Sequence, residues 1–274
     1  MSPIIFKLGP ILIYSYGLMI GIGVVMVMWS SERSAKKEGL NHLKILDLML
    51  VVFLASFVGG RLVRVSLDWS NYAYDILKIF KIWEGGFDFY GGLILALPIG
   101  IWYLQRNKLP VLNTIDLVIT YVPLAHAFGR VGCFLEGCCY GTLTTVPWAV
   151  RFPKWFSAQD GIIGTPAFIQ HVNMHLIESS ATLSLPVHPT QLYSSLYLFI
   201  IFSILVILRK YKKFDGEILS AYLILYATAR FFIEFLRVDA QRIFFDISLY
   251  QLCSIAFFIS GIILMIVFSQ RKPI

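Results

Sequence analysis

Charged and imidazole side chains occur at helical spacing inside two otherwise apolar segments. His126 and Arg130 are four residues apart, and so are Arg230 and Glu234. On a helix, this spacing places the two side chains of each pair on one face. A guanidinium is a rigid fork that matches phosphate oxygens, and charges inside an apolar span indicate function by default. We therefore expect Arg130 and Arg230, on facing helices near the outer leaflet, to bind an anionic phospholipid headgroup.

Several of these charges also have a purely structural interpretation. An ion pair between Arg230 and Glu234 would lower the cost of inserting both residues into a membrane. Arg61, Arg64 and Arg237 lie near the ends of apolar runs. There a long side chain can extend to the interface and leave its charge in water. For these residues, a role in a functional site and a purely structural role are both compatible with the sequence.

Arg130 is harder to explain in structural terms. It is flanked by Gly129 and Gly132, deep in a run that is otherwise apolar. Glycines let another backbone or a lipid headgroup come close. For His126, a neutral buried imidazole that bonds a backbone carbonyl is an equal alternative to a functional role.

Two further groups lie where apolar runs begin. Tyr90 precedes Gly91 and Gly92 and follows an aromatic segment. This pattern indicates a bent start of a helix or, alternatively, an aromatic belt at the membrane interface. Pro189 suits the first position of another helix. A helix that begins there brings three polar side chains together at its outer mouth: His188, Gln191 and Tyr193.

Three of the four cysteines are clustered, which raises the question of a metal. Cys133, Cys138 and Cys139 lie near His126 in the sequence, whereas Cys253 is far along the chain. Their spacing does not match a zinc ribbon or finger, and adjacent cysteines seldom share a tetrahedral site. We therefore expect no metal. The alternatives are small packing residues or a disulfide in this segment.

The composition decides which kind of element positions these residues. Of the 274 residues, 58% are hydrophobic and 14% are charged, and the mean hydropathy is +0.74. Soluble domains are about a quarter charged, so a soluble enzyme and a disordered chain are both excluded. The net charge of +7 does not indicate nucleic-acid binding, because the basic residues form short clusters between apolar runs. The expected solvent is the bilayer.

Seven apolar runs are long enough to cross a bilayer, which needs roughly 17–25 residues. They predict an all-α integral membrane protein with seven transmembrane helices and one transmembrane domain over residues 1–274. The third run is the weakest, because it contains Pro98 and several glycines. Only Lys7 is charged before the first run, so we expect a retained helix rather than a removable signal peptide. The runs are 11–30, 45–65, 87–105, 113–135, 190–208, 217–236 and 248–268.

The basic clusters set the orientation of these spans. They fall in alternate connections, so with seven spans they all lie on one side, which the positive-inside rule makes cytoplasmic. The N-terminus is then periplasmic and the C-terminus cytoplasmic. The long, proline-containing segment 136–189 becomes a small periplasmic head between spans four and five. The basic residues are Arg33, Lys36, Lys37, Lys44, Arg106, Lys108, Arg209, Lys210, Lys212, Lys213, Arg271 and Lys272.

The order of the motifs resembles one known family. The segment GRVGCFLEGCCYG at 129–141 is similar to the signature of the prolipoprotein diacylglyceryl transferase family. Two segments resemble its next landmarks: HPTQLY at 188–193, and RFFIEFLR at 230–237 with Asp239. Weaker matches follow the same order in the first three spans: Tyr16-Gly17-Leu18, GRL at 60–62 and FYGGLI at 89–94. Each motif alone is weak, but all of them in order on a chain of this length are specific.

The resemblance implies an enzyme of the bacterial inner membrane that needs neither a metal nor an organic cofactor. It takes the diacylglyceryl group of phosphatidylglycerol and transfers it to the lipobox cysteine thiol that follows the signal peptide of a prolipoprotein. A thioether forms, and glycerol-1-phosphate leaves. The expected partners are therefore phosphatidylglycerol, prolipoproteins and membrane lipids, and no nucleic acid.

The chemistry of this transfer suits the predicted residues. Arg130 and Arg230 would stabilise the charge that grows on the leaving phosphate. The acceptor thiol must lose a proton, because the thiolate is the nucleophile. The family often has a histidine, a candidate base, where Tyr90 stands. We therefore expect His126 to be the base and Tyr90 to donate a hydrogen bond. The predicted substrate-binding residues are Tyr16, Arg61, Glu136, His188, Gln191, Tyr193, Glu234 and Arg237.

The signature departs from the common family pattern. That pattern has asparagine in place of Cys133 and Glu136, and glutamate in place of Cys138. We interpret the cysteine-rich form as a subgroup. Two alternatives stay open: a non-catalytic homologue that binds phospholipid, or a related transferase that uses another thiol acceptor.

Overall fold

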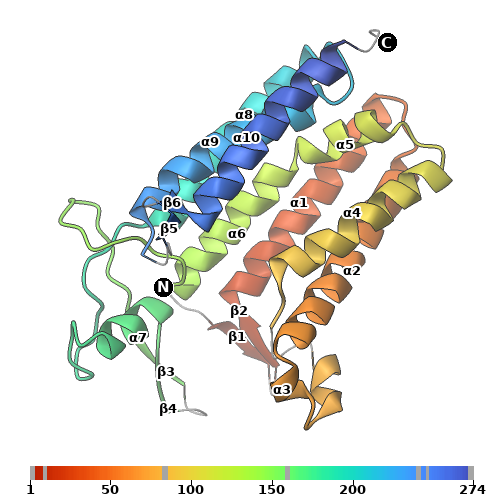
Figure 1. The fold of residues 1–274 in the computed structure, drawn as a ribbon. Helices are drawn as coiled ribbons and strands as arrows, with labels where there is room; N and C mark the ends of the chain where they lie inside the picture. The colour runs from red at the N-terminus through yellow and green to blue at the C-terminus, as the bar shows by residue number, and fades with distance from the viewer. Residues whose placement is uncertain are drawn as a thin grey trace. The chain divides into compact units, whose positions relative to one another are not determined.

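The computed structural model describes residues 4–8, 11–81, 86–157, 161–238, 242–244 and 247–270. Asp239 of the third motif and the basic residues Arg271 and Lys272 lie outside the described residues. The chain divides into two compact units (Figure 1). One is Met28–Leu117, and the other joins Met1–Val27 to Val118–Ile274.

In the described residues, six helical segments are long and apolar enough to cross a membrane. This finding confirms a mostly helical, multi-pass membrane protein. The third predicted run forms helix α4 (Phe89–Arg106), which contains Pro98 and is not one of the six. The six are α1 (Ser15–Lys37), α2 (His42–Leu67), α5 with α6 (Val111–Glu136), α8 (Thr190–Lys210), α9 with the 3-10 turn η3 (Glu217–Leu236) and α10 (Leu249–Ser269).

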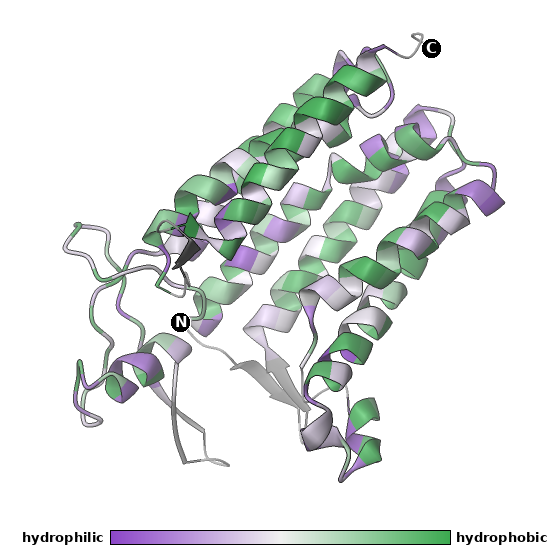
Figure 2. Cartoon of the chain, in the orientation of Figure 1, coloured by the Kyte–Doolittle hydropathy of each residue, from purple (hydrophilic) through white to green (hydrophobic). Residues whose placement is uncertain are grey.

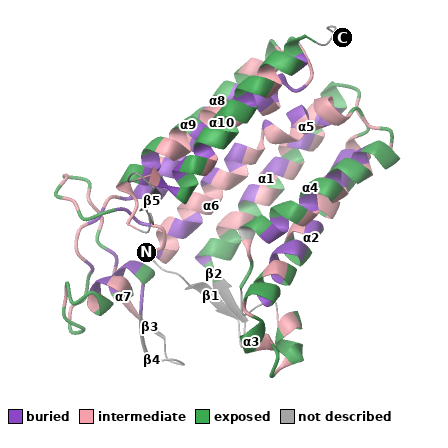
Figure 3. Cartoon of the chain, viewed as in Figure 1, coloured by how far each residue is buried: buried purple, intermediate pink, exposed green. Residues whose placement is uncertain are grey.

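The helices carry apolar residues on faces that the protein itself does not cover. Figure 2 shows hydrophobic residues along α8, α9 and α10, and Figure 3 shows that many residues on these helices are exposed. On α10, Ile259 is 51% exposed and Ile263 is 53% exposed. Exposed apolar surface costs about 25 cal/mol per Å² in water, so these faces suit contact with lipid.

In the unit Met28–Leu117, helices α2 and α4 approach each other closely at glycines. A Cβ on Gly59 would lie 2.4 Å from the carbonyl oxygen of Gly91. Small residues of this kind let membrane helices pack together. The Asp88 side chain caps α4 by accepting a hydrogen bond from Gly91 N at 2.8 Å. Along the chain between the two helices lie α3 (Trp69–Tyr72) and the 3-10 helix η1 (Ile76–Phe80).

In the other unit, α8, α9 (Glu217–Ile233) and α10 lie side by side, and α6 (Val122–Glu136) packs on α8 (Figure 1). A Cβ on Gly261 of α10 would lie 2.8 Å from Ile224 Cγ1, so this glycine allows the close approach of α9 and α10. A buried cluster of α8 and α9 contains Ile201, Leu205, Ile218 and Ala221.

Segment 136–189, called the head below, contains little helix in its described residues, as its prolines predict. It contains the antiparallel hairpin of β3 (Lys154–Ser157) and β4 (Gly161–Gly164), followed by the short helix α7 (Pro166–Asn173). Its buried core consists of Tyr140, Phe152, Ala167 and Val187.

Two further hairpins are not apparent from the hydropathy pattern. Strand β1 (Ile4–Leu8) pairs with β2 (Ile11–Tyr14), and β5 (Arg242–Phe244) pairs with β6 (Ile247–Ser248). The first expected span, 11–30, therefore begins later than predicted, at Ser15. Its first four residues, Ile-Leu-Ile-Tyr, are rich in β-branched and aromatic side chains, which favour a strand.

Candidate functional site

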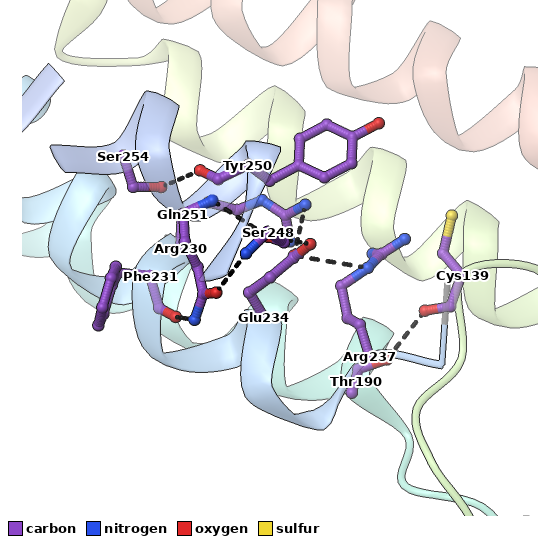
Figure 4. A network of polar contacts seen from close by, with 10 residues as sticks. All are labelled: Cys139, Thr190, Arg230, Phe231, Glu234, Arg237, Ser248, Tyr250, Gln251 and Ser254. Atoms are coloured by element: carbon purple, nitrogen blue, oxygen red, sulfur yellow. Dashed lines mark hydrogen bonds and ion pairs between the residues drawn. The ribbon is translucent and has the colours of Figure 1, made fainter. Parts of the chain in front are cut away.

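One buried carboxylate, that of Glu234, holds two arginines near the end of α9 (Figure 4). Arg230 Nη2 lies 2.9 Å from Glu234 Oε2, and Arg237 Nε lies 3.8 Å from the same oxygen. The Ser248 hydroxyl donates a hydrogen bond to Glu234 Oε1 at 3.2 Å. The Arg230–Glu234 ion pair expected from the spacing is therefore present, and it extends to Arg237. Because Arg237 is bound in this network, its charge is not simply extended into water.

The start of α10 fixes this network from the opposite side (Figure 4). Ser248 and Gln251 form a capping box, with Gln251 N donating to Ser248 Oγ at 3.2 Å and Ser248 N donating to Gln251 Oε1 at 2.9 Å. The Arg230 guanidinium lies over Tyr250, with Cζ 5.1 Å from the ring centroid. Ser248, Tyr250 and Gln251 were not predicted from the motifs. The Ser-x-x-Gln pattern directly before an apolar run is the signal that finds the cap.

Arg130 has a different environment from the other two arginines. It lies on α6 and is partly buried. Among the residues that the structure describes, no carboxylate lies within ion-pair distance of Arg130. Its charge instead acts on the thiols of Cys133 and Cys139 and on the hydroxyls of Tyr197 and Tyr226. These tyrosines were not predicted from the sequence, although Tyr226 precedes Arg230 by one helical turn.

His126 is close enough to both predicted arginines to feel their charges. Its ring centroid is 5.5 Å from that of Tyr226. The charges of Arg130 and Arg230 both act on the imidazole. The structure thus brings His126, Arg130 and Arg230 into one neighbourhood, on α6 and α9.

Tyr16 reaches the same neighbourhood from α1. A Cβ on Gly132 would lie 3.1 Å from Tyr16 Cδ2 and 3.2 Å from Tyr16 Cα, so this glycine allows α1 to approach α6. The charge of Arg130 acts on the Tyr16 hydroxyl. A Cβ on Gly129, in contrast, would meet no described atom within 4 Å. Of the two glycines beside Arg130, one serves helix packing and the other faces open space.

A tight turn after α6 joins the first two motifs. Thr190 Oγ1 donates to the carbonyl oxygen of Cys139 at 2.8 Å, and Gln191 Nε2 donates to that of Cys138 at 2.7 Å. Gly141 N donates to the carbonyl oxygen of His188 at 2.9 Å. Gln191 is buried, so the structure uses this predicted substrate-binding side chain to hold the turn.

His188 and Tyr193 meet where α8 begins, as predicted. His188 Nδ1 is 3.3 Å from the Tyr193 hydroxyl, which also accepts a hydrogen bond from Trp148 Nε1 at 2.7 Å. Trp148 comes from the head and was not predicted. Glu136, the last residue of α6, is partly buried beside the same turn.

The clustered thiols converge, despite the expectation that adjacent cysteines seldom share a site. The Sγ atoms of Cys133, Cys138 and Cys139 all lie within 4.8 Å of one another, and the three cysteines are free. The expected alternative of a disulfide is therefore not formed here. Hydrogen bonds from the Cys133 and Cys138 thiols, with the charges of Arg237 and Arg130, hold the pKa of the Cys139 thiol below its usual range. The same hydrogen bonds raise the pKa of the Cys138 thiol, so one thiolate is favoured in the cluster.

Arg61 and Tyr90 belong to the unit Met28–Leu117. Arg61 is buried, so its charge is not exposed to water. Its guanidinium donates to four backbone carbonyls, those of Lys78, Ile79, Lys81 and Gly86, at 2.6–3.3 Å. Arg61 therefore organises the loop before α4. Tyr90, the second residue of α4, is 48% exposed. Arg64 pairs with Asp68 at 3.2 Å on the surface.

Comparisons with known proteins agree on one family. Residues 3–267 match the family model described as "Prolipoprotein diacylglyceryl transferase". A relative from Serratia proteamaculans is 34% identical and covers 99% of this chain and 94% of its own length. One from Clostridium tetani is 33% identical and covers 99% of this chain and 100% of its own. Both are named phosphatidylglycerol–prolipoprotein diacylglyceryl transferase.

Proposed function

This chain belongs to the prolipoprotein diacylglyceryl transferase family, and we propose that it transfers the diacylglyceryl group of phosphatidylglycerol to the lipobox cysteine of prolipoproteins. The acceptor sulfur attacks the glyceryl carbon, the carbon–oxygen bond to phosphate breaks, and glycerol-1-phosphate leaves. The product is a thioether. The attacking sulfur belongs to the substrate, so the enzyme needs to supply charge stabilisation, a proton acceptor and orientation.

The observation that carries this proposal is the contrast between the arginines. Glu234 holds Arg230 and Arg237 in place, whereas no described carboxylate pairs with Arg130. A guanidinium without a protein anion, next to open space at Gly129, suits a phosphate from the lipid. Arg130 binds that phosphate directly, and Arg230 adds its charge from α9.

Charge stabilisation follows from this arrangement. As the carbon–oxygen bond breaks, negative charge grows on the phosphate oxygens. Glu234 holds Arg230 in place, and both arginines would meet that charge in a site of low dielectric, so little reorganisation is required in the transition state. The tyrosines around Arg130, Tyr197 and Tyr226, add hydroxyl donors.

The acceptor thiol must lose its proton before or during attack. His126 is the imidazole of this neighbourhood, and we assign it the role of base. We keep Tyr90 as a hydrogen-bond donor in the reaction.

The other predicted residues bind or position the substrates. His188 and Tyr193, with Trp148, form a polar group at the mouth of α8 for the prolipoprotein. Tyr16 and Glu136 border the Arg130 neighbourhood. The positioning residues are Arg61, Gln191, Glu234 and Arg237.

The membrane setting completes the proposal. Helix α4 has 18 residues, a length of about 27 Å, close to the roughly 30 Å hydrocarbon core. We assign α4 as a further span, the third along the chain, which brings the total to seven. The basic connections then face the cytoplasm, and the head at 136–189 faces the periplasm of a bacterial inner membrane, within one domain over residues 1–274.

Mass spectrometry of a lipobox peptide, incubated with phosphatidylglycerol and the purified protein, tests the function. We expect the peptide cysteine to gain one diacylglyceryl group. Arg130→Ala should lower the rate at least about 100-fold, while Arg151→Ala, at an exposed position in the head, should not. Full activity of Arg130→Ala contradicts its role. Folded wild-type protein without transfer contradicts the function and favours a binding homologue or another acceptor.

A further inference from the structure

The three converging thiols form a donor set that the reaction described above does not use. Cys133 lies within α6, and Cys138 and Cys139 lie in the turn that follows this helix. All three Sγ atoms lie within 4.8 Å of one another. An ion bound at about 2.3 Å from three sulfurs requires them about 4 Å apart, so small side-chain rotations complete the site.

The backbone explains how adjacent cysteines reach one point. Cys139 has φ of +60°, in the left-handed region, and Gly137 has φ of +80°. These values reverse the chain directly after α6, and Cys138 N donates to the carbonyl oxygen of Cys133 at 3.1 Å. Thr190 and Gln191 hold the carbonyls of Cys139 and Cys138 from α8. The turn is thus fixed by protein contacts alone, which organises the donors before any ion binds.

Cations near the cluster offset part of the negative charge of bound thiolates. Three thiolates and a divalent ion together carry one negative charge. The charges of Arg130 and Arg237 both act on Cys139, so the site has compensating cations. Thiolate sulfur is a soft donor that selects zinc and softer ions over magnesium or calcium.

We propose that Cys133, Cys138 and Cys139 bind one thiophilic metal ion, such as Zn²⁺, with a fourth position open for the acceptor thiol. Three protein ligands and an open position are the arrangement of catalytic rather than structural zinc sites. The use of the open position rests on the proposed function; the binding of the ion does not.

The step balances without an oxidant. The acceptor R–SH displaces water from the ion, and its proton passes to the base, for which His126 is proposed above. A thiol on such an ion is held as thiolate. Its sulfur attacks the glyceryl carbon while the carbon–oxygen bond to phosphate breaks, and that bonding pair leaves on glycerol-1-phosphate. The resulting thioether is a weaker ligand, so the product dissociates.

Metal binding is tested on the full-length protein in detergent after reduction and removal of metal. Titration with Cd²⁺ and with Zn²⁺ should give one bound ion per chain in the wild type and in Cys253→Ser, the matched control in α10. Cys139→Ser and Cys138→Ser should bind the ion at least about tenfold more weakly. Loss of a residue that only hydrogen-bonds a metal ligand already lowers metal affinity by about that factor. Alkylation of the wild type, read by mass spectrometry, should show the three clustered cysteines protected by the ion and Cys253 still reactive.

The outcomes separate the two proposals. No stoichiometric binding, no protection of the three thiols, or equal binding by Cys139→Ser and the wild type overturns the metal site. If the titration shows that the protein binds the ion, but the rate of transfer to the lipobox peptide is unchanged after a chelator removes it, the role of the open position is overturned. Absence of transfer with and without metal contradicts the proposed function, while the titration still decides the site.

Discussion

At the scale of residues, charge is distributed unequally among three arginines. Glu234 is 2% exposed and binds two of them, which offsets the cost of its burial. Arg130 takes no part in that network, and we propose that it binds the lipid phosphate. The spacing rule for helices predicted the Arg230–Glu234 contact correctly. It could not predict that Arg237 and Ser248 complete the same network, because they meet Glu234 only after the chain has turned back into α10.

The two glycines beside Arg130 should respond differently to a methyl group. Gly132→Ala would bring Cβ to 3.1 Å from Tyr16 and 3.3 Å from Met19, and overpacking of this kind costs about 1–3 kcal/mol. Gly129→Ala meets no described atom within 4 Å and gains up to about 1 kcal/mol of helix propensity. Thermal unfolding in detergent should show a lower midpoint for Gly132→Ala only. Equal midpoints for the two variants would show that α1 does not pack on Gly132.

At the scale of elements, the tight turn between α6 and the head decides where the cysteines and Gln191 point. Hydropathy predicts that a helix ends near residue 136, and Gly137 in the left-handed conformation marks that end. The positive φ of Cys139 is unusual for a residue with a side chain. Spacing arguments assume ordinary backbone, and for this reason they indicated that adjacent cysteines would not share a site. The hairpin strands were missed in a similar way, since pairing between short segments leaves little hydropathy signal.

The head should lose stability in acid through His171. This residue is 3% exposed, and its Nδ1 accepts a hydrogen bond from Leu185 N at 3.2 Å, which requires the neutral ring at that atom. Burial lowers the pKa of His171. In the unfolded chain the pKa is about 6.5, so below that pH the unfolded state binds more protons and stability falls.

Limited proteolysis of the head at pH 7.5 and pH 5.5 checks this prediction. Cleavage of the wild type and of His175→Asn, at an exposed histidine, should be faster at the lower pH. His171→Asn should remove most of that difference. Identical cleavage of the wild type at both pH values would show that His171 does not couple protons to folding of the head.

At the scale of the whole molecule, the role of α4 sets the parity of the membrane crossings. If α4 spans, the connection between α1 and α2 and the connection between α8 and α9 lie on the same side. If it does not, they lie on opposite sides. The basic residues Lys36, Lys37, Lys212 and Lys213 beside these connections favour one cytoplasmic side.

Epitopes inserted at positions 39 and 214, one at a time, test the parity in intact and permeabilised spheroplasts. With seven spans, an antibody should reach both epitopes only after permeabilisation. An epitope at position 145, in the head, should be reached without it. If only one of the two connections is protected, α4 does not span, and the chain crosses the membrane six times.

The shared carboxylate has a consequence for turnover. Arg130, Arg230 and Arg237 together with Glu234 carry two net positive charges, and one remains after the single negative charge of the metal-bound thiolates is included. The phosphodiester of the lipid is a monoanion. The monoester that leaves becomes a dianion above its second pKa of about 6, and an excess of positive charge attracts a dianion more strongly than the monoanionic substrate. Glycerol-1-phosphate should therefore inhibit the enzyme competitively with lipid, more strongly at pH 7.5 than at pH 5.5 in initial-rate measurements. Equal inhibition at both pH values would contradict this balance of charge. Arginines that stabilise the departing phosphate also slow its release, and release of that product then limits the rate.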